Sequence, residues 1–233
     1  MCQECGCEQP STTITINKSL TEENDKLAHD TWHELQKQEV LGINLLGAPG
    51  SGKTTVIEGL AKVLGAENIS VIQGDLESSV DKKRLEAQSI DTFQINTHSG
   101  CHLIAQMITD ALQNLSLKNK KYLIIENVGN LVCPAGVKLG QYLDIITSAT
   151  TEGGDKPEKY PIIFHYAKLA LITKADLAKV VEFDEEKYMA DVTKTNPKIK
   201  ILKTSKKEPE TFHAVAHFLE HEREHFLAHT HKH

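Results

Sequence analysis

The 233-residue sequence has no excess of positive charge. It carries 26 basic and 32 acidic residues, for a formal net charge of −6. This balance argues against a general nucleic-acid-binding protein, which would normally show a basic stripe. The sequence also lacks an apolar run of the roughly 20 residues that a membrane-spanning helix needs. Its first residues form neither a basic nor an apolar segment, so we expect no secretory signal there. These absences predict a cytoplasmic protein with no nucleic-acid or membrane partner.

Cysteine is scarce and poorly distributed for disulfide bonding. There are five cysteines, and three of them lie within the first seven residues. In a reducing cytoplasm such thiols stay free and can bind metals. Cys2, Cys5 and Cys7 could supply three thiolates, joined by the terminal amine, in a tetragonal arrangement that suits Ni²⁺. Zn²⁺ is a physical competitor, and the alternative is a disordered arm with incidental thiols.

Internal repeats are absent, and short apolar runs alternate instead with amphipathic stretches. The apolar runs are rich in β-branched residues and have no polar face, which predicts an α/β fold with a mostly parallel sheet flanked by helices. We expect a flexible metal-binding arm over 1–18, a helix over 19–38, a P-loop domain over 39–228 including a C-terminal helix, and a histidine-rich tail over 229–233. The expected strands cover residues 43–46, 69–73, 92–95, 122–126, 144–148, 169–173 and 200–202. The amphipathic stretches include 78–88 and 101–115, and the last helix is expected over roughly 209–226.

Residues 47–54 read Gly-Ala-Pro-Gly-Ser-Gly-Lys-Thr and match the phosphate-binding P-loop, with an apolar run before them and a helical pattern after them. Glycines let backbone N–H groups surround an anion, and the helix N-terminus adds partial positive charge. Lys53 would contact the β and γ phosphates, and the Thr54 hydroxyl can ligate Mg²⁺. A turn that binds nothing is the weak alternative. The predicted phosphate-binding residues are Gly47, Ala48, Pro49, Gly50, Ser51, Gly52, Lys53, Thr54 and Thr55.

Carboxylates at two strand ends predict the rest of the catalytic site. Glu126 ends an apolar strand, and Glu126-x-x-Gly129 resembles the Asp-x-x-Gly switch of GTPases, in which the glycine N–H faces the γ-phosphate. An exposed acid ending the strand is the alternative for Glu126. Asp75 also ends a strand and could bind Mg²⁺ or position the attacking water, whereas Asp81 is either an Mg²⁺ ligand or a solvated acid at a helix start. The predicted catalytic residues are Lys53, Asp75, Glu126 and Gly129, and the predicted Mg²⁺ site comprises Thr54, Asp75, Asp81 and Glu126.

Residues 173–177 resemble the Asn-Lys-x-Asp guanine motif. The Asp176 carboxylate can accept from guanine N1–H and N2–H₂, a donor edge that adenine lacks. Lys174 would lay its aliphatic stem over the purine ring. Thr173 stands where the motif usually has Asn. The sequence therefore predicts GTP binding, with one supporting hydrogen bond left open.

A second group of metal-type residues comprises Cys101, His102 and Cys133. Cys101 is expected near a helix N-terminus, where the thiolate is favoured. Cys133 lies seven residues after Glu126, on the loop that leaves the switch. Metal at this group would therefore be tied to the nucleotide state. Two distant cysteines are more often buried small apolar residues, but this setting favours ligands.

Histidines recur every fourth residue near the C-terminus. Neighbours at this spacing on a helix can chelate transition metals. An apolar stripe that includes Phe212 and Leu219 is expected to dock the helix, which leaves the histidines facing water as either a weak metal store or a solvated face. The repeated positions are His213, His217, His221, His225 and His229.

Together these motifs resemble the HypB family, GTPases that assist nickel insertion during maturation of nickel-iron hydrogenase. The resemblance implies a SIMIBI-class P-loop fold, slow GTP hydrolysis and GTP-promoted homodimerisation. It implies Ni²⁺ or Zn²⁺ near the dimer interface at Cys101, His102 and Cys133, and a high-affinity nickel motif at Cys2, Cys5 and Cys7. The implied partners are a HypA-type metallochaperone and the hydrogenase large subunit. The matching segments are 1–7, 47–54, 74–75, 81, 100–103, 126–134, 151–157 and 174–177.

Three rival interpretations remain open on the sequence. A urease-type accessory GTPase usually carries a Cys-Pro-His metal motif, whereas this chain has Cys101-His102 and a separate Cys133-Pro134. A small-molecule P-loop kinase would need an acceptor pocket with its own base. A metal-storage module would bind nickel with no nucleotide turnover.

Overall fold

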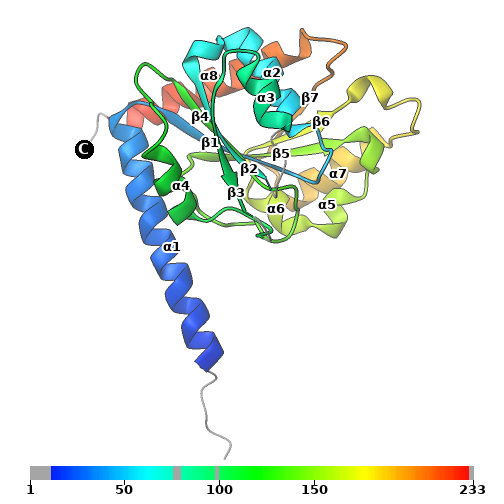
Figure 1. Ribbon diagram of the computed structural model, residues 1–233. Helices are drawn as coiled ribbons and strands as arrows, with labels where there is room; N and C mark the ends of the chain where they lie inside the picture. Colours follow the sequence, from blue (N-terminus) through cyan, green and yellow to red (C-terminus); the bar gives the residue numbers. More distant parts are fainter. Residues whose placement is uncertain (1–11, 76–79, 98–99, 231–233) are drawn as a thin grey trace, which may run out of the picture.

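A seven-stranded, wholly parallel sheet forms the centre of the molecule in the computed structural model, which describes residues 12–75, 80–97 and 100–230 (Figure 1). The strand order is β3-β2-β4-β1-β5-β6-β7. All seven predicted strands are confirmed. The five inner strands are almost entirely buried, whereas the edge strands β3 and β7 are partly exposed. The strands are β1 (Leu41–Gly47), β2 (Ile69–Asp75), β3 (Asp91–Asn96), β4 (Tyr122–Glu126), β5 (Leu143–Ala149), β6 (Leu169–Thr173) and β7 (Lys200–Lys203).

Helices cover both faces of the sheet. They are α1 (Thr12–Lys37), α2 (Lys53–Leu64), α3 (Val80–Glu86), α4 (Ala105–Leu112), α5 (Lys156–Lys159), α6 (Pro161–Tyr166), α7 (Glu185–Thr195) and α8 (Thr211–Thr230), with 3₁₀ turns at Ala66–Asn68, Thr150–Glu152 and Ala175–Leu177. Helix α1 begins at Thr12. Residues 12–18, which were predicted to belong to the arm, are therefore helical, and the predicted helix start at 19 is too late. Helix α8 runs on to Thr230, beyond the predicted end near 226.

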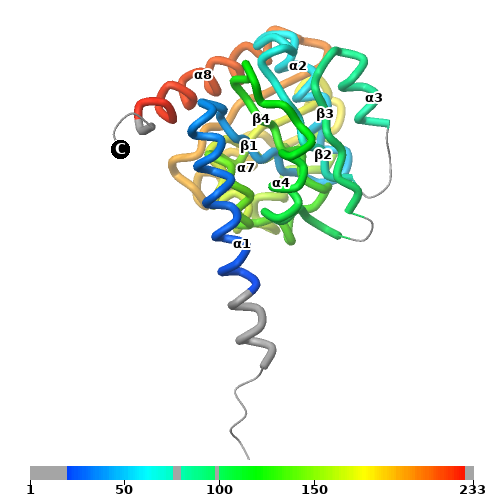
Figure 2. Tube along the Cα trace, turned by 60° about the vertical axis from the view of Figure 1, so that its left-hand side comes forward, coloured from blue at the N-terminus to red at the C-terminus, as the bar shows by residue number. Residues whose placement is uncertain are grey.

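Alternating side chains of the central strands build a separate core on each face. Ile43 and Leu45 face α2 and α8, where they pack with Leu60 and Leu219. On the other face, Leu123 and its neighbours pack against α1 and α4, and a third cluster joins the β5–β6 half of the sheet to α6 and α7. Helix α1 runs beside α4, and its C-terminal part meets α8 (Figure 2). Among the described residues, no helix combines the length and apolar character needed to cross a membrane.

Candidate nucleotide and metal site

The P-loop leaves the middle of the sheet. Strand β1 lies between β4 and β5 and ends at Gly47, and α2 begins at Lys53. Gly47 has no room for a Cβ atom, which would collide with the side chains of Thr147 and Ser51. Gly52, the N-cap of α2, has a φ of 91°, a left-handed conformation that favours glycine. The loop thus has the backbone geometry of an anion-binding turn at the C-terminal edge of the sheet.

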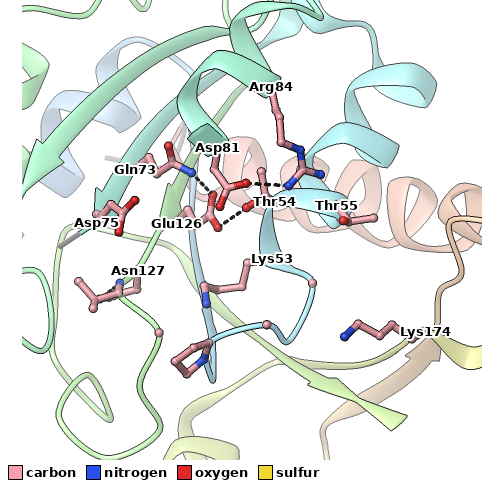
Figure 3. Close-up of a pocket in the computed structure, with 16 residues that line it drawn as sticks. Lys53, Thr54, Thr55, Gln73, Asp75, Asp81, Arg84, Glu126, Asn127 and Lys174 are labelled. Carbon is pink, nitrogen blue, oxygen red and sulfur yellow. Dashed lines mark hydrogen bonds and ion pairs between the residues drawn. The ribbon is translucent and has the colours of Figure 1, made fainter. Parts of the chain in front are cut away.

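A cavity of about 410 Å³ opens beside this loop (Figure 3). Lys53 is almost fully buried there, and its Nζ donates to the carbonyls of Gly47 and Ala48, both at 3.2 Å. Burial lowers the pKa of Lys53, and the carboxylate of Glu126 opposes this effect. A buried ammonium facing the cavity is suited to polyphosphate. The predicted catalytic residues Lys53, Asp75, Glu126 and Gly129 all line this cavity.

Glu126 is buried at the end of β4 and accepts two hydrogen bonds. Thr54 Oγ1 donates to its Oε1 at 2.8 Å, and Gln73 Nε2 donates to its Oε2 at 2.8 Å. Burial raises the pKa of Glu126, whereas Lys53 and the two donors favour the carboxylate. The alternative of an exposed acid is therefore wrong. Gln73 was missed in the sequence, although a polar residue in an otherwise apolar strand was a usable signal.

Asp75 and Asp81 border the same cavity from β2 and α3 (Figure 3). Arg84 holds Asp81, with Nη1 donating to Asp81 Oδ1 at 2.7 Å, and its other nitrogen bonds Glu58 on α2 at 2.8 Å. Asp81 is therefore an ion-paired acid at the edge of the cavity. Both aspartates line the same cavity as Thr54 and Glu126, and binding of Mg²⁺ by these four residues stays a prediction.

The segment after Glu126 lies directly against the P-loop. A Cβ atom on Gly129 would come within 2.8 Å of Pro49, so only glycine allows this approach. Asn130 N donates to the carbonyl of Gly47 at 3.1 Å. The segment after Glu126 is therefore in direct contact with the P-loop at two points.

A second cavity, of about 250 Å³, continues from the first past Gly52, Thr55 and Lys174. Asp176 lines it, and Ser205 Oγ donates to its carboxylate at 2.7 Å. That hydrogen bond lowers the pKa of Asp176, with Lys207 helping at 3.5 Å. Lys53 and Asp176, the residues predicted to contact the phosphates and the base, thus line two adjoining cavities.

Thr173 supplies the connection that the sequence left open. Its Oγ1 donates to the carbonyl of Ser51 in the P-loop at 2.6 Å. Lys174, which follows, has a φ of 53°, and its backbone carbonyl accepts from Thr150 at 2.8 Å. Thr173 thus connects residues 173–177 to the P-loop by a hydrogen bond.

The ligand atoms of Cys101, His102 and Cys133 all lie within 4.8 Å of one another, as the sequence predicts for a metal site. Cys101 Sγ is 3.4 Å from His102 Nδ1. Burial lowers the pKa of His102, which favours the neutral imidazole that metals bind. The expectation of a favoured thiolate at Cys101 is wrong. Helix α4 begins only at Ala105, and hydrogen bonding with the Cys133 thiol raises the pKa of Cys101.

Two asparagines join this cysteine cluster to the nucleotide site. Asn127, which lines the phosphate cavity, accepts with Oδ1 from Leu103 N at 3.2 Å, directly after His102. Asn130, which bonds the P-loop through its backbone, accepts with Oδ1 from Cys133 N at 3.3 Å. The Cys101–His102 half is therefore joined to a residue of the cavity wall by one hydrogen bond, and Cys133 is joined to the P-loop by two hydrogen bonds through Asn130. Neither side-chain contact is predictable from the sequence, because the tertiary structure sets the partners.

The remaining predicted metal ligands lie elsewhere. Cys2, Cys5 and Cys7 lie outside the described residues, as does the side chain of His229. The other α8 histidines are exposed, while Phe212 and Leu219 on the same helix are buried, as predicted. His221 and His225 bring their Nε2 atoms to 3.3 Å.

Fold and site together define a P-loop nucleotide-binding protein of the SIMIBI class. Residues 41–203 match the family model described as CobW/HypB/UreG, nucleotide-binding domain. The chain belongs to the HypB family of hydrogenase maturation factors.

Individual relatives show the extent of this similarity. The chain is 39% identical over 204 residues to the hydrogenase maturation factor HypB of Escherichia coli K12, covering 85% of this chain and 70% of the relative. It is 37% identical over 201 residues to that of Azotobacter chroococcum, covering 86% of this chain and 66% of the relative. A crystal structure of HypB from Helicobacter pylori in complex with nickel superposes with a TM-score of 0.84 at 35% identity, covering 87% of this chain and 96% of that one.

Proposed function

We propose that this chain is a GTP-hydrolysing metallochaperone that binds nickel and assists its insertion into nickel-iron hydrogenase. The observation that carries the proposal is the pair of asparagine links between the nucleotide cavity and the cysteine cluster. Membership of the HypB family and the similarity to a nickel-bound HypB structure support it. Zn²⁺ is the second metal that the thiol and imidazole donors would accept.

The proposed reaction is hydrolysis of GTP to GDP and phosphate. Asp176 would accept from the guanine edge, and Lys53 would contact the β and γ phosphates. Thr54, Glu126, Asp75 and Asp81 would hold Mg²⁺ directly or through water, and the ion would neutralise charge on the phosphate oxygens. Asp75 would also position the attacking water, and the Gly129 N–H would face the γ-phosphate.

The proposed output of hydrolysis is a change in metal affinity. A γ-phosphate at Gly129 would fix the segment that Asn130 anchors to the P-loop, and Asn130 holds the backbone of Cys133. Asn127 holds the other half of the cluster through Leu103. Because the nucleotide and the metal would both act on the segment after Glu126, the affinity for each would depend on whether the other is bound.

The additional metal-type residues fit a supply role in this proposal. Cys2, Cys5 and Cys7 would form a high-affinity nickel site, and the α8 histidines a weaker store. A HypA-type metallochaperone and the hydrogenase large subunit are the proposed partners, and the protein would act in the cytoplasm.

The coupling is tested by titrating Ni²⁺ into the protein bound to GDP or to a non-hydrolysable GTP analogue. A coupling free energy of about 1–3 kcal/mol predicts affinities that differ by roughly 5–150-fold. In Asn130→Ala the three metal ligands remain but Cys133 loses its connection, so this ratio should fall toward one. Asn114→Ala removes an exposed amide in the turn after α4, is the matched control and should keep the ratio. Equal affinities in the unaltered protein would contradict the proposal.

Two alternatives are separable by simple assays. A urease-type accessory GTPase would load urease with nickel in place of hydrogenase. The Escherichia coli and Azotobacter relatives are named hydrogenase maturation factors, whereas HypB of Helicobacter pylori is named a hydrogenase/urease maturation factor, so nickel loading of purified urease and of hydrogenase separates the two. A small-molecule kinase would consume GTP in proportion to an added acceptor, whereas the proposed GTPase hydrolyses it without one.

A further inference from the structure

We infer that α1 carries a further transition-metal site, formed by His29 and His33. The two residues lie one helical turn apart, and their Nε2 atoms are 3.1 Å from each other. Their rings are nearly perpendicular, at 81°, with centroids 4.3 Å apart. Both side chains are exposed, so a metal ion and its water ligands could reach them. The two Nε2 atoms form a hydrogen bond with each other, and a metal ion that binds both nitrogens would replace its proton.

The separation of the two nitrogens fits a bound metal ion. With metal–nitrogen bonds of about 2.1 Å, two ligands at a right angle are about 3.0 Å apart. Imidazole suits Ni²⁺ and Zn²⁺, and Ni²⁺ accepts ligands at right angles. Asp30 Oδ1 lies 4.0 Å from His29 Nδ1 and adds negative charge beside the site. Water would fill the remaining coordination positions.

The affinity of this site should be lower than that of the cysteine cluster. In the described part of the chain, Cys101, His102 and Cys133 form the only group of three possible ligands. The α1 pair supplies two donors and no thiol, so we expect it to fill after the cysteines. Its closest counterpart is the pair His221 and His225 on α8, with an Nε2 separation of 3.3 Å.

The position of α1 suggests a role for this site that rests on the proposed function. Asn24, five residues before His29 on the same helix, accepts from Ala105 N and donates to the carbonyl of Lys138, both at 2.9 Å. These partners lie just after His102 and Cys133 in the sequence, so α1 crosses both segments that carry the cysteine cluster. The helix also follows the N-terminal cysteines along the chain. A metal held at His29 and His33 would lie on the helix that connects the two thiol sites in the sequence.

The single tryptophan of the chain gives this site its own signal. Trp32 lies between the two histidines, with its ring centroid 4.8 Å from that of His33 and 6.5 Å from that of His29. We propose titrating the full chain with Ni²⁺, whose open-shell electrons quench a nearby indole, while recording Trp32 fluorescence. Saturable quenching is expected after the cysteine sites have filled.

Each of His29→Ala and His33→Ala should weaken the quenching transition about tenfold or more, because the second imidazole binds at a high local concentration. His221→Ala removes one member of the α8 pair and should leave the Trp32 transition unchanged. Quenching unaffected by either α1 substitution, or by one of the two, would overturn the chelate. The titration is made without nucleotide, so its result does not depend on whether GTP controls the cysteine cluster.

Discussion

Asp176 is oriented before any base is bound. The hydroxyl of Ser205 and the ammonium of Lys207 hold its carboxylate at the wall of the second cavity, and the hydrogen bond from Ser205 lowers its pKa. An ionised acceptor in a fixed position can distinguish guanine, which offers two donors, from adenine, which does not. We therefore propose that guanine selectivity depends on Asp176 and on the two side chains that hold it.

We predict that Asp176→Asn shifts nucleotide preference from GTP toward xanthosine triphosphate. The amide would face the guanine N1–H with a donor, whereas it can donate to the O2 carbonyl of xanthine. One lost bidentate contact corresponds to about 1–3 kcal/mol, so GTP affinity should fall roughly 5–150-fold. Competition binding with both nucleotides measures the shift. Retained preference for GTP would remove Asp176 from base recognition, and Asp191→Asn on α7 serves as the control.

At the residue scale, local motifs were predictable and their supports were not. The P-loop, Glu126 and Asp176 could be found because each lies in a short segment with fixed spacing. The hydrogen bond from Leu103 N to Asn127 joins residues 24 apart, and no pattern in the sequence specifies it. The proximity of His29 and His33 was predictable, because they have the same four-residue spacing as the histidines of α8.

A chain of polar contacts crosses the sheet between β5, β1 and the loop after β4. Asp144 Oδ1 accepts from Asn44 at 2.8 Å and from Gln141 at 2.9 Å, and Asn44 Oδ1 accepts from Asn127 at 3.1 Å. Burial raises the pKa of Asp144 to about 6 from its ordinary 3.8, despite both donors. This series of contacts ends at Asn127, which accepts from Leu103 N beside the cysteine cluster.

The raised pKa gives Asp144 a defined effect on stability. Because the folded protein holds this proton more tightly than the unfolded chain, the stabilisation is fully present below pH 3.8 and is lost as pH rises through about 6. Asp144→Asn stays neutral and keeps the Oδ1 acceptor. Relative to the unaltered protein, it should gain about 1–3 kcal/mol in unfolding free energy between pH 4.5 and 7.5, by order of magnitude.

Urea denaturation at the two pH values measures this difference. Titration of the many histidines affects both proteins equally and cancels in the comparison. Asp110→Asn, at an exposed position on α4, controls for loss of a surface charge. A difference independent of pH would show that Asp144 does not titrate in this range.

Elements were predicted better in their interiors than at their ends. The strands followed from continuous apolar runs, but the start of α4 was placed too early, at 101. The segment before Ala105 bends to bring Cys101 toward Cys133, and the first N–H of α4 is capped by Asn24 from α1. Because the capping residue comes from a distant helix, no capping motif next to α4 in the sequence indicates where the helix begins.

At the scale of the whole molecule, apolar side chains beside the cysteine cluster indicate a surface suited to a second copy. Val132, next to Cys133, is 64% exposed, and Ile104 lies just after His102 and is 38% exposed. We predict that a GTP analogue shifts the mass from 25.9 kDa to twice that value, measured by light scattering. Val132→Asp should prevent the shift and leave nucleotide affinity intact.

Met189→Asp provides the matched control for this prediction. Met189 is an exposed apolar residue on α7, a helix that packs with α5 and α6. This variant should dimerise like the unaltered protein. A constant monomer mass with bound analogue in the unaltered chain would contradict GTP-dependent dimerisation.

The position of β4 has a consequence for how the molecule is made. Strand β4 pairs with both β1 and β2, although both precede it in the chain. These pairings join residues far apart in sequence, which slows folding and leaves the strand edges of β1 and β2 unpaired until residues 122–126 arrive. A nascent chain on the ribosome would already have its P-loop but would lack Glu126 and the switch. We therefore expect nucleotide binding with Mg²⁺ only after β4 has inserted between β1 and β2, and the bound ligand would stabilise completed chains in preference to partial ones.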